Sequence, residues 1–155
     1  MSDRPKRSVL CLFPEPAIED LESFRQRHIE HPSKSVPLHI TLLYEFFPPH
    51  QLDEAVIERL DEIARRTPRF EFQAIPISAF PLSKVLYLTP SPMTPIERLA
   101  SSLHDEFPEW SPPPSHLIYH MTIAMGYSIE RQAEPGRRGY FMLASTSVCF
   151  QAVTL

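Results

Sequence analysis

The sequence predicts an α+β domain whose two halves are related by an approximate twofold symmetry. Three observations support this fold class. Strand-like and helix-like segments alternate along the 155 residues, the pattern His-x-Thr occurs twice, and its two occurrences begin 81 residues apart, in separate halves of the chain. We expect residues 1–155 to form a single domain, because a chain of this length can bury one hydrophobic core.

The first half predicts two strands and two helices. An apolar run at residues 8–13 predicts a strand, and a helix is expected from residue 16 to about residue 29. Acidic residues come early and basic residues late in that helix, as its dipole favours. A loop over residues 31–37 leads into the first motif strand, which Pro48-Pro49 ends. Apolar residues at helical spacing then predict a helix over residues 52–66.

The second half predicts a hairpin, a helix and the second motif strand. The hairpin strands cover residues 70–80 and 84–89 and are joined around Pro81. The segments that follow are, in order, a helix at 95–107, a Pro-rich connector at 108–115, the second motif strand, a polar loop or short helix at 128–139, and one or two closing strands within 140–155.

The first motif, His39-Ile40-Thr41, lies in a run that alternates between two faces. The apolar face consists of Leu38, Ile40, Leu42, Tyr44 and Phe46. We therefore expect Tyr44 in the core. His39 and Thr41 are expected side by side on the opposite face, about 7 Å apart at the rise of a strand. Glu45 shares their face and is expected at a solvated strand end.

The second motif, His120-Met121-Thr122, has the same organisation. Its apolar face consists of Leu117, Tyr119, Met121, Ile123 and Met125. Tyr119 is therefore expected in the core, and His120 and Thr122 on the working face. Random placement of seven His and seven Thr gives roughly 0.3 such matches, so two matches in matching strand contexts predict a functional pair.

The two motifs together supply the groups that phosphodiester chemistry requires. An imidazole can accept or donate a proton near neutral pH, and a hydroxyl can donate a hydrogen bond to an anionic oxygen. Two such pairs facing each other provide an acid, a base and two hydroxyls that can donate hydrogen bonds to an anion. The candidate catalytic residues are His39, Thr41, His120 and Thr122, and this chemistry needs no metal and no cofactor.

Composition narrows the classes of partner. The net charge is −4 and the basic clusters are short, which argues against a long duplex nucleic acid as ligand. With three glycines and no GxGxxG or Walker-type loop, an enzyme of nucleoside triphosphates or dinucleotides is not expected. Cys11 and Cys149 fall in apolar runs and are expected to act as small hydrophobic residues. No segment approaches a membrane span, and we expect a cytoplasmic monomer.

Several segments beyond the motifs resemble the two-histidine (2H) phosphoesterase superfamily, in the branch of RNA 2′,3′-cyclic phosphodiesterases also called 2′-5′ RNA ligases. The segments are SVLCLF, VPLHITLLYEF, FEFQAIPISAFPLSKVLYLTP, PIERLASSLHDEF and HMTIAMGYS. Family motifs often place Pro directly before the His, where Leu38 and Tyr119 stand here. Glu45 takes a place where Pro is common.

The resemblance implies a fold and an activity. The fold is two pseudo-symmetric lobes of antiparallel β-sheet, with flanking helices, around a central cleft. The activity is hydrolysis of a 2′,3′-cyclic phosphate on an RNA end or a small nucleotide, with 2′-5′ RNA ligation as a further reaction of the same site. By analogy with the family, His39 is the proton donor and His120 the acceptor, although the residues alone leave this assignment open.

Three other interpretations remain open from the sequence. The same fold can serve as a non-catalytic module that binds an RNA end or a nucleotide. The spacings His28-x-x-His31 and His116-x-x-x-His120 suit a metal. The connector with Trp110 can act as a Pro-rich ligand of a partner protein. Apart from that metal interpretation, the histidines outside the motifs are expected at the surface or on the cleft rim, namely His28, His31, His50, His104 and His116. Arg137 and Arg138 are candidates to reach a phosphate.

Overall fold

The computed structural model describes residues 7–110, 118–126, 143–146 and 151–154. Within these residues the strands are β1 (Ser8–Leu12), β2 (Ile40–Phe46), β3 (Phe70–Phe80), β4 (Val85–Ser91), β5 (Met121–Met125), β6 (Leu143–Thr146) and β7 (Gln151–Thr154). The α-helices are α1 (Glu19–His28), α2 (Glu54–Arg66) and α3 (Thr94–Glu106), and the short 3-10 helices are η1 (Pro32–Ser35), η2 (Pro49–Gln51) and η3 (Pro108–Trp110).

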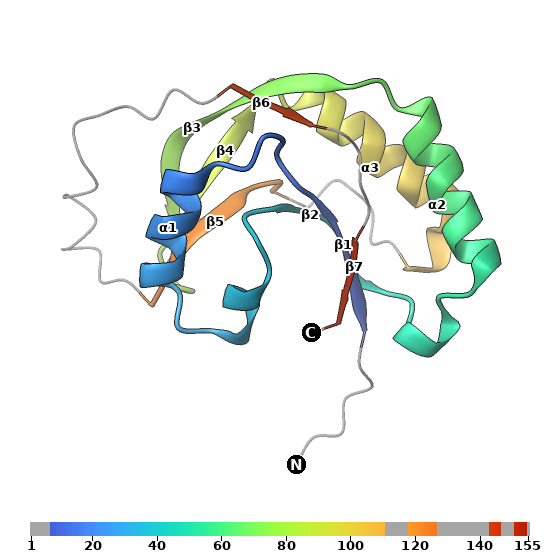
Figure 1. Ribbon diagram of the computed structural model, residues 1–155, viewed down its shortest axis with the longest axis horizontal. Helices are drawn as coiled ribbons and strands as arrows, with labels where there is room; N and C mark the ends of the chain where they lie inside the picture. The colour runs from blue at the N-terminus through green and yellow to red at the C-terminus, as the bar shows by residue number, and fades with distance from the viewer. Residues whose placement is uncertain (1–6, 111–117, 127–142, 147–150, 155) are drawn as a thin grey trace, which may run out of the picture.

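The strands form one antiparallel sheet in the order β6-β3-β4-β5-β2-β1-β7 (Figure 1). Two groups of strands are recognisable in this order. The first contains β2, β1 and β7, and the second contains β6, β3, β4 and β5. They meet where β2 pairs with β5 through Ile40 and Met121. The predicted α+β fold with two antiparallel lobes and flanking helices is therefore confirmed, and the lobes join edge to edge.

The helices follow from apolar stripes and end signals that the sequence carries. In α2, Val56, Leu60 and Ile63 form the buried stripe, and the side chain of Asp53 accepts the Val56 amide at 2.9 Å as an N-cap. Helix α3 buries a similar stripe and packs against α2 on the right of Figure 1, whereas α1 stands at the left and packs against β5.

The core lies between the sheet and the pair α2–α3. Phe46 and Phe107 are fully buried and meet edge to face, with ring centroids 5.1 Å apart. The ring of Trp110 contacts that of Phe47 at a tilted angle, with centroids 4.9 Å apart, and the Arg7 guanidinium lies over the indole ring. Trp110 thus packs against the core, while residues 111–115 of the predicted Pro-rich connector lie outside the described residues.

The prediction that Tyr44 belongs to the core is wrong. Its side chain is 58% exposed, whereas Leu42 and Leu43 are both buried. The cause is a change of register between β1 and β2: Cys11 pairs with Thr41, but Leu10 pairs with Leu43. This extra residue in β2 is a β-bulge, which breaks the two-residue period. Tyr44 therefore shares the side of the strand on which Thr41 lies.

Other predictions agree with the structure or lie outside it. Tyr119 is buried, as expected, and Glu45 is exposed at the end of β2 with φ of 62°. The predicted polar segment 128–139, Cys149 and His116 fall outside the described residues. None of the helices in the described ranges is long and apolar enough to cross a lipid bilayer.

Candidate functional site

The two His-x-Thr motifs meet at the point where the two groups of strands join. Ile40 is the middle residue of the first motif and Met121 is the middle residue of the second, and these two residues are paired across β2 and β5. Directly opposed residues in an antiparallel pair have Cα atoms about 4.5–5.5 Å apart. The histidine and threonine of each motif are immediate chain neighbours of this pair. All four candidate residues therefore lie around the point where β2 pairs with β5.

Each motif histidine stands one residue before its strand rather than inside it. β2 begins at Ile40 and β5 at Met121. In both cases the imidazole Nδ1 donates to the carbonyl oxygen two residues earlier, His39 to Pro37 at 2.7 Å and His120 to Ile118 at 2.6 Å. A carbonyl can only accept, so this bond fixes the tautomer and leaves Nε2 with the lone pair in the neutral ring.

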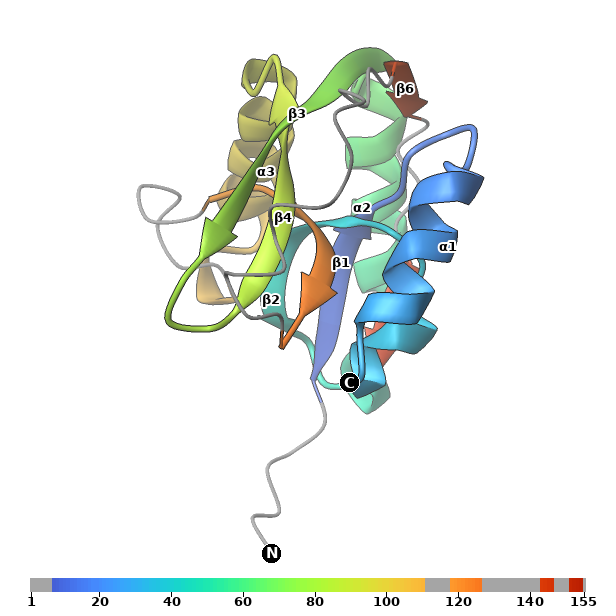
Figure 2. The same cartoon turned by 90° about the vertical axis from the view of Figure 1, so that its left-hand side faces the viewer.

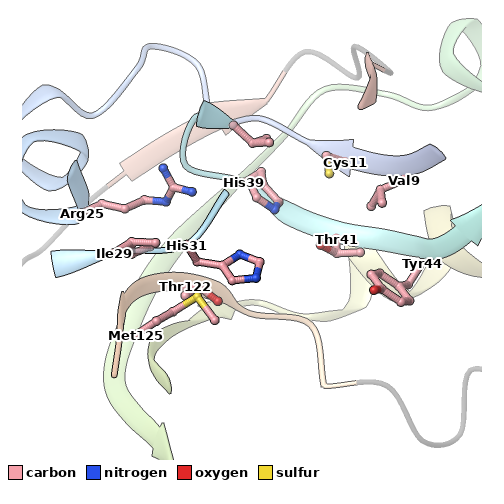
Figure 3. A pocket seen from close by; sticks show the side chains of 11 residues that line it. Val9, Cys11, Arg25, Ile29, His31, His39, Thr41, Tyr44, Thr122 and Met125 are labelled. Carbon is pink, nitrogen blue, oxygen red and sulfur yellow. The ribbon is translucent and has the colours of Figure 1, made fainter. Parts of the chain in front are cut away.

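A cavity of about 220 Å³ opens beside the pairing of β2 with β5 (Figure 3). Its lining residues are Val9, Cys11, Arg25, Ile29, His31, Val36, His39, Thr41, Tyr44, Thr122 and Met125. Three of the four predicted residues, His39, Thr41 and Thr122, thus share one cavity. His120 is not among the lining residues, although its charge is close enough to influence His39.

His120 is held by aromatic side chains of the β3–β4 hairpin. Its ring lies 5.1 Å from Phe80 and 5.1 Å from Tyr87, edge to face with both. Phe80 and Tyr87 stack on each other at 4.2 Å. Figure 2 shows the hairpin of β3 and β4 alongside β5. Together with the bond to the Ile118 carbonyl, these contacts leave the imidazole little rotational freedom.

Thr41 has a partner across the strand pair. Cys11 of β1 is the register partner of Thr41, and their side chains are hydrogen-bonded. Cys11 is a free, buried thiol, and burial raises its pKa to about 11, although the bond to Thr41 acts in the opposite direction. The thiol therefore stays neutral near pH 7 and can act as a weak hydrogen-bonding partner of the Thr41 hydroxyl.

Among the cavity residues that were not predicted as site residues, three carry polar groups on large side chains, namely Tyr44, His31 and Arg25. The sequence predicts Tyr44 in the core and His31 at the surface, and Arg25 is one of the basic residues late in the helix predicted from residue 16 to about residue 29. Figure 3 shows the His31 ring projecting into the cavity between His39 and Thr122. Arg25 is 1% exposed. One signal for Arg25 was available, because it follows Leu21 by four residues and so falls on the apolar face of α1.

The pKa of His39 is lowered from its usual value near 6.5. Burial is the largest cause, because it disfavours the charged ring. The bond to the Pro37 carbonyl acts in the opposite direction, and the positive charges of Arg25 and His120 lower the pKa further. In the free protein the His39 imidazole is therefore neutral at pH 7, and its Nε2 lone pair can accept a proton or a hydrogen bond from an acidic group.

This lowered pKa predicts a pH dependence of stability. Between the folded pKa of His39 and about 6.5, the unfolded chain binds more protons than the folded one. The contribution of His39 to the free energy of unfolding is therefore complete above about pH 6.5 and is lost as the pH falls toward the folded pKa. Between about pH 7.5 and about pH 5.5, the free energy of unfolding measured with urea should fall more in the wild type than in His39→Gln. Equal losses would contradict the assignment.

A metal cluster is not evident in the described part of the chain. No group of three or more His, Cys, Asp or Glu side chains is placed there to share an ion. His28 contacts the ring of Phe24 at 4.3 Å, and His31 lines the cavity.

Comparisons with known proteins agree with the fold and with the family that the sequence resembles. A sequence model of the 2′-5′ RNA ligase superfamily matches residues 13–134. A provisionally named phosphoesterase of Geobacillus kaustophilus (strain HTA426) is 33% identical over 97 residues, which are 61% of this chain and 56% of that protein. A second provisionally named phosphoesterase, from Oceanobacillus iheyensis (strain HTE831), is 26% identical over 117 residues, 74% of this chain and 68% of that protein. The chain thus spans little more than half the length of the first of these relatives.

Solved structures of Escherichia coli LigT share the fold. LigT with 3′-AMP superposes with a TM-score of 0.58 at 15% identity, covering 98% of this chain and 96% of LigT. LigT with ATP superposes with a TM-score of 0.57, also at 15% identity and with the same coverage. At this identity the likeness concerns the fold. The family match, in contrast, covers most of the sequence, and the chain therefore belongs to the 2′-5′ RNA ligase superfamily of 2H phosphoesterases.

Proposed function

We propose that the chain is a metal-independent phosphodiesterase that opens a 2′,3′-cyclic phosphate with His39 and His120 as acid and base. The observation that carries this proposal is the pairing of Ile40 with Met121, which brings one His-x-Thr motif from each half of the chain to the contact between β2 and β5. Membership in the 2′-5′ RNA ligase superfamily supports a phosphoesterase-type reaction.

The reaction is a displacement at phosphorus by water. One imidazole takes a proton from the water through Nε2 as the water oxygen bonds to phosphorus. The bond from phosphorus to one ribose oxygen breaks, and the other imidazole gives that oxygen a proton. One histidine must start neutral and the other charged. When an RNA hydroxyl replaces water as the nucleophile, the same ring opening forms a phosphodiester, which is ligation. In the reverse reaction, which closes the cyclic phosphate, the two histidines exchange roles.

The assignment of His39 as proton donor is compatible with its lowered pKa once substrate is bound. In the free protein burial and nearby positive charge favour the neutral ring. A bound phosphate anion brings negative charge to the same place and raises the pKa of His39. We therefore propose that His39 takes up its proton as the anion binds, and that His120 acts as the base in hydrolysis.

Thr41 and Thr122 line the same cavity, and their hydroxyls are the proposed donors to the phosphate oxygens. Charge on these oxygens is redistributed in the transition state, and donors that are already oriented need no reorganisation. The bond between Cys11 and Thr41 helps to orient one of the two hydroxyls.

The size and lining of the cavity support a small nucleotide or a single RNA end as substrate. A volume of about 220 Å³ with mostly apolar walls suits a nucleoside phosphate better than a long polyanion. The exposed ring of Tyr44 offers a surface for a nucleobase. LigT has been solved with 3′-AMP, ATP and NADP+, which agrees with nucleotide binding on this fold. We further propose that residues 1–155 act as one domain and as a monomer in the cytoplasm.

The test is turnover without metal. We expect the protein to hydrolyse nucleoside 2′,3′-cyclic phosphates and short RNAs with a cyclic phosphate end in the presence of EDTA, with a bell-shaped dependence of rate on pH. The product is identified as a 2′- or 3′-phosphate by chromatography. Binding of these compounds without any turnover would instead favour the non-catalytic module, and turnover that EDTA abolishes would reject metal independence.

A further inference from the structure

Helix α1 is tied to the backbone that carries His39. The Glu22 carboxylate accepts the amide of Leu38, the residue directly before His39, at 2.7 Å. The same carboxylate accepts Arg25 Nη1 at 3.2 Å and Gln26 Nε2 at 2.8 Å. Arg25 and Gln26 also donate to the Lys34 carbonyl, at 3.3 and 3.0 Å. These bonds fix both ends of the five-residue segment that leads into the first motif.

Arg25 is a buried charge on the wall of the cavity. It is 1% exposed, it lines the same cavity as His39, and Figure 3 shows its guanidinium directed toward His39. Burying an ion pair is costly, and apolar residues of similar volume often stabilise a fold equally well. An arginine in the apolar stripe of α1 is therefore poorly explained by stability alone, and its position beside a candidate phosphate site offers a reason.

We propose that Glu22 and Arg25 form a positioning pair for His39, in which Glu22 fixes the backbone before the imidazole and Arg25 gives the cavity a fixed positive charge. The inference rests on the proposed function for its role in catalysis. In the free protein this charge favours the neutral ring, and with a phosphate bound it is balanced by the anion. Arg25 thus couples the binding of an anionic substrate to protonation of His39.

The charged and titratable groups around His39 come from four parts of the chain. Arg25 and Glu22 belong to α1, His31 follows that helix, and His120 precedes β5. Cys11 of β1 is neutral near pH 7 because burial raises its pKa. Arg25 and Glu22 act on the pKa of His39 in opposite directions, Arg25 lowering it and Glu22 raising it. This opposition separates an electrostatic role from a purely structural one.

The experiment follows the His39 ring by NMR titration, with its resonance assigned from the signal missing in His39→Gln. We expect Arg25→Gln to raise the pH midpoint of the His39 titration and Glu22→Gln to lower it. Arg27→Gln removes the same charge from an exposed position of the same helix and should leave the midpoint unchanged. The limb of the pH profile of kcat/KM that reports His39 should move with these midpoints, and Arg25→Gln should raise KM for a cyclic phosphate about tenfold.

The outcomes separate this proposal from the proposed function. Circular dichroism checks that each variant is folded, and Arg25→Met replaces Arg25→Gln if the latter is not. Midpoints that move in the same direction in the Arg25 and Glu22 variants, or that do not move, overturn the positioning pair even if the wild type is active. Opposite shifts in a protein without turnover support the pair and reject the proposed function instead.

Discussion

Replacing either motif histidine by glutamine should lower kcat for a cyclic phosphate by about 10²–10⁴-fold, because each imidazole supplies a proton transfer that no neighbour can replace. Glutamine preserves much of the polar volume and can still donate a hydrogen bond to the carbonyl of Pro37 or Ile118 that Nδ1 contacts. The loss should therefore appear in kcat more than in KM. Single-turnover and steady-state rates with purified His39→Gln and His120→Gln measure it.

Two controls make this result specific. His50→Gln changes an exposed histidine of η2, which does not line the cavity, and should retain wild-type rates. The double variant His39→Gln/His120→Gln should be little worse than the poorer single variant, because groups that act in one proton-transfer sequence are not additive. If either single variant keeps wild-type kcat, that histidine is not the acid or the base.

The elements of the fold were largely predictable because their signals are local. The stripe of Val56, Leu60 and Ile63 predicts the second helix, and it ends at Arg66 in the structure as expected. The segment predicted at 70–80 coincides with β3. Apolar periodicity and chain breakers depend on neighbouring residues alone, and they locate such elements well. The convergence of the motifs depended on the resemblance to a family, because spacing alone does not say which strands become neighbours.

The cavity walls were less predictable because they depend on partners distant in the sequence. The bulge that turns Tyr44 outward arises from the register between β2 and β1, which a single strand does not encode. Arg25 and His31 reach the site because α1 packs against β5, about a hundred residues further along the chain. The lowered pKa of His39 is equally a product of this packing, since burial is its main cause.

The threonines should show the second largest effect on turnover. If Thr41 and Thr122 donate to the phosphate oxygens as charge develops, Thr→Val at either position should lower kcat about 10²–10³-fold, as the loss of one preorganised donor does in other enzymes. Valine keeps the shape and the strand propensity of threonine but has no hydroxyl. Thr→Ser, which restores the hydroxyl, should recover most of the rate in the same assay.

A hydroxyl that matters only for folding makes a different prediction. Thr41 also hydrogen-bonds Cys11, and losing that bond should cost about 1 kcal/mol of unfolding free energy. Urea unfolding measures this loss separately from kcat. Thr89→Val on β4, outside the cavity, provides a strand threonine for comparison and should leave turnover unchanged. Valine variants that unfold earlier yet keep wild-type kcat would assign Thr41 and Thr122 to the sheet and leave the phosphate oxygens without these donors.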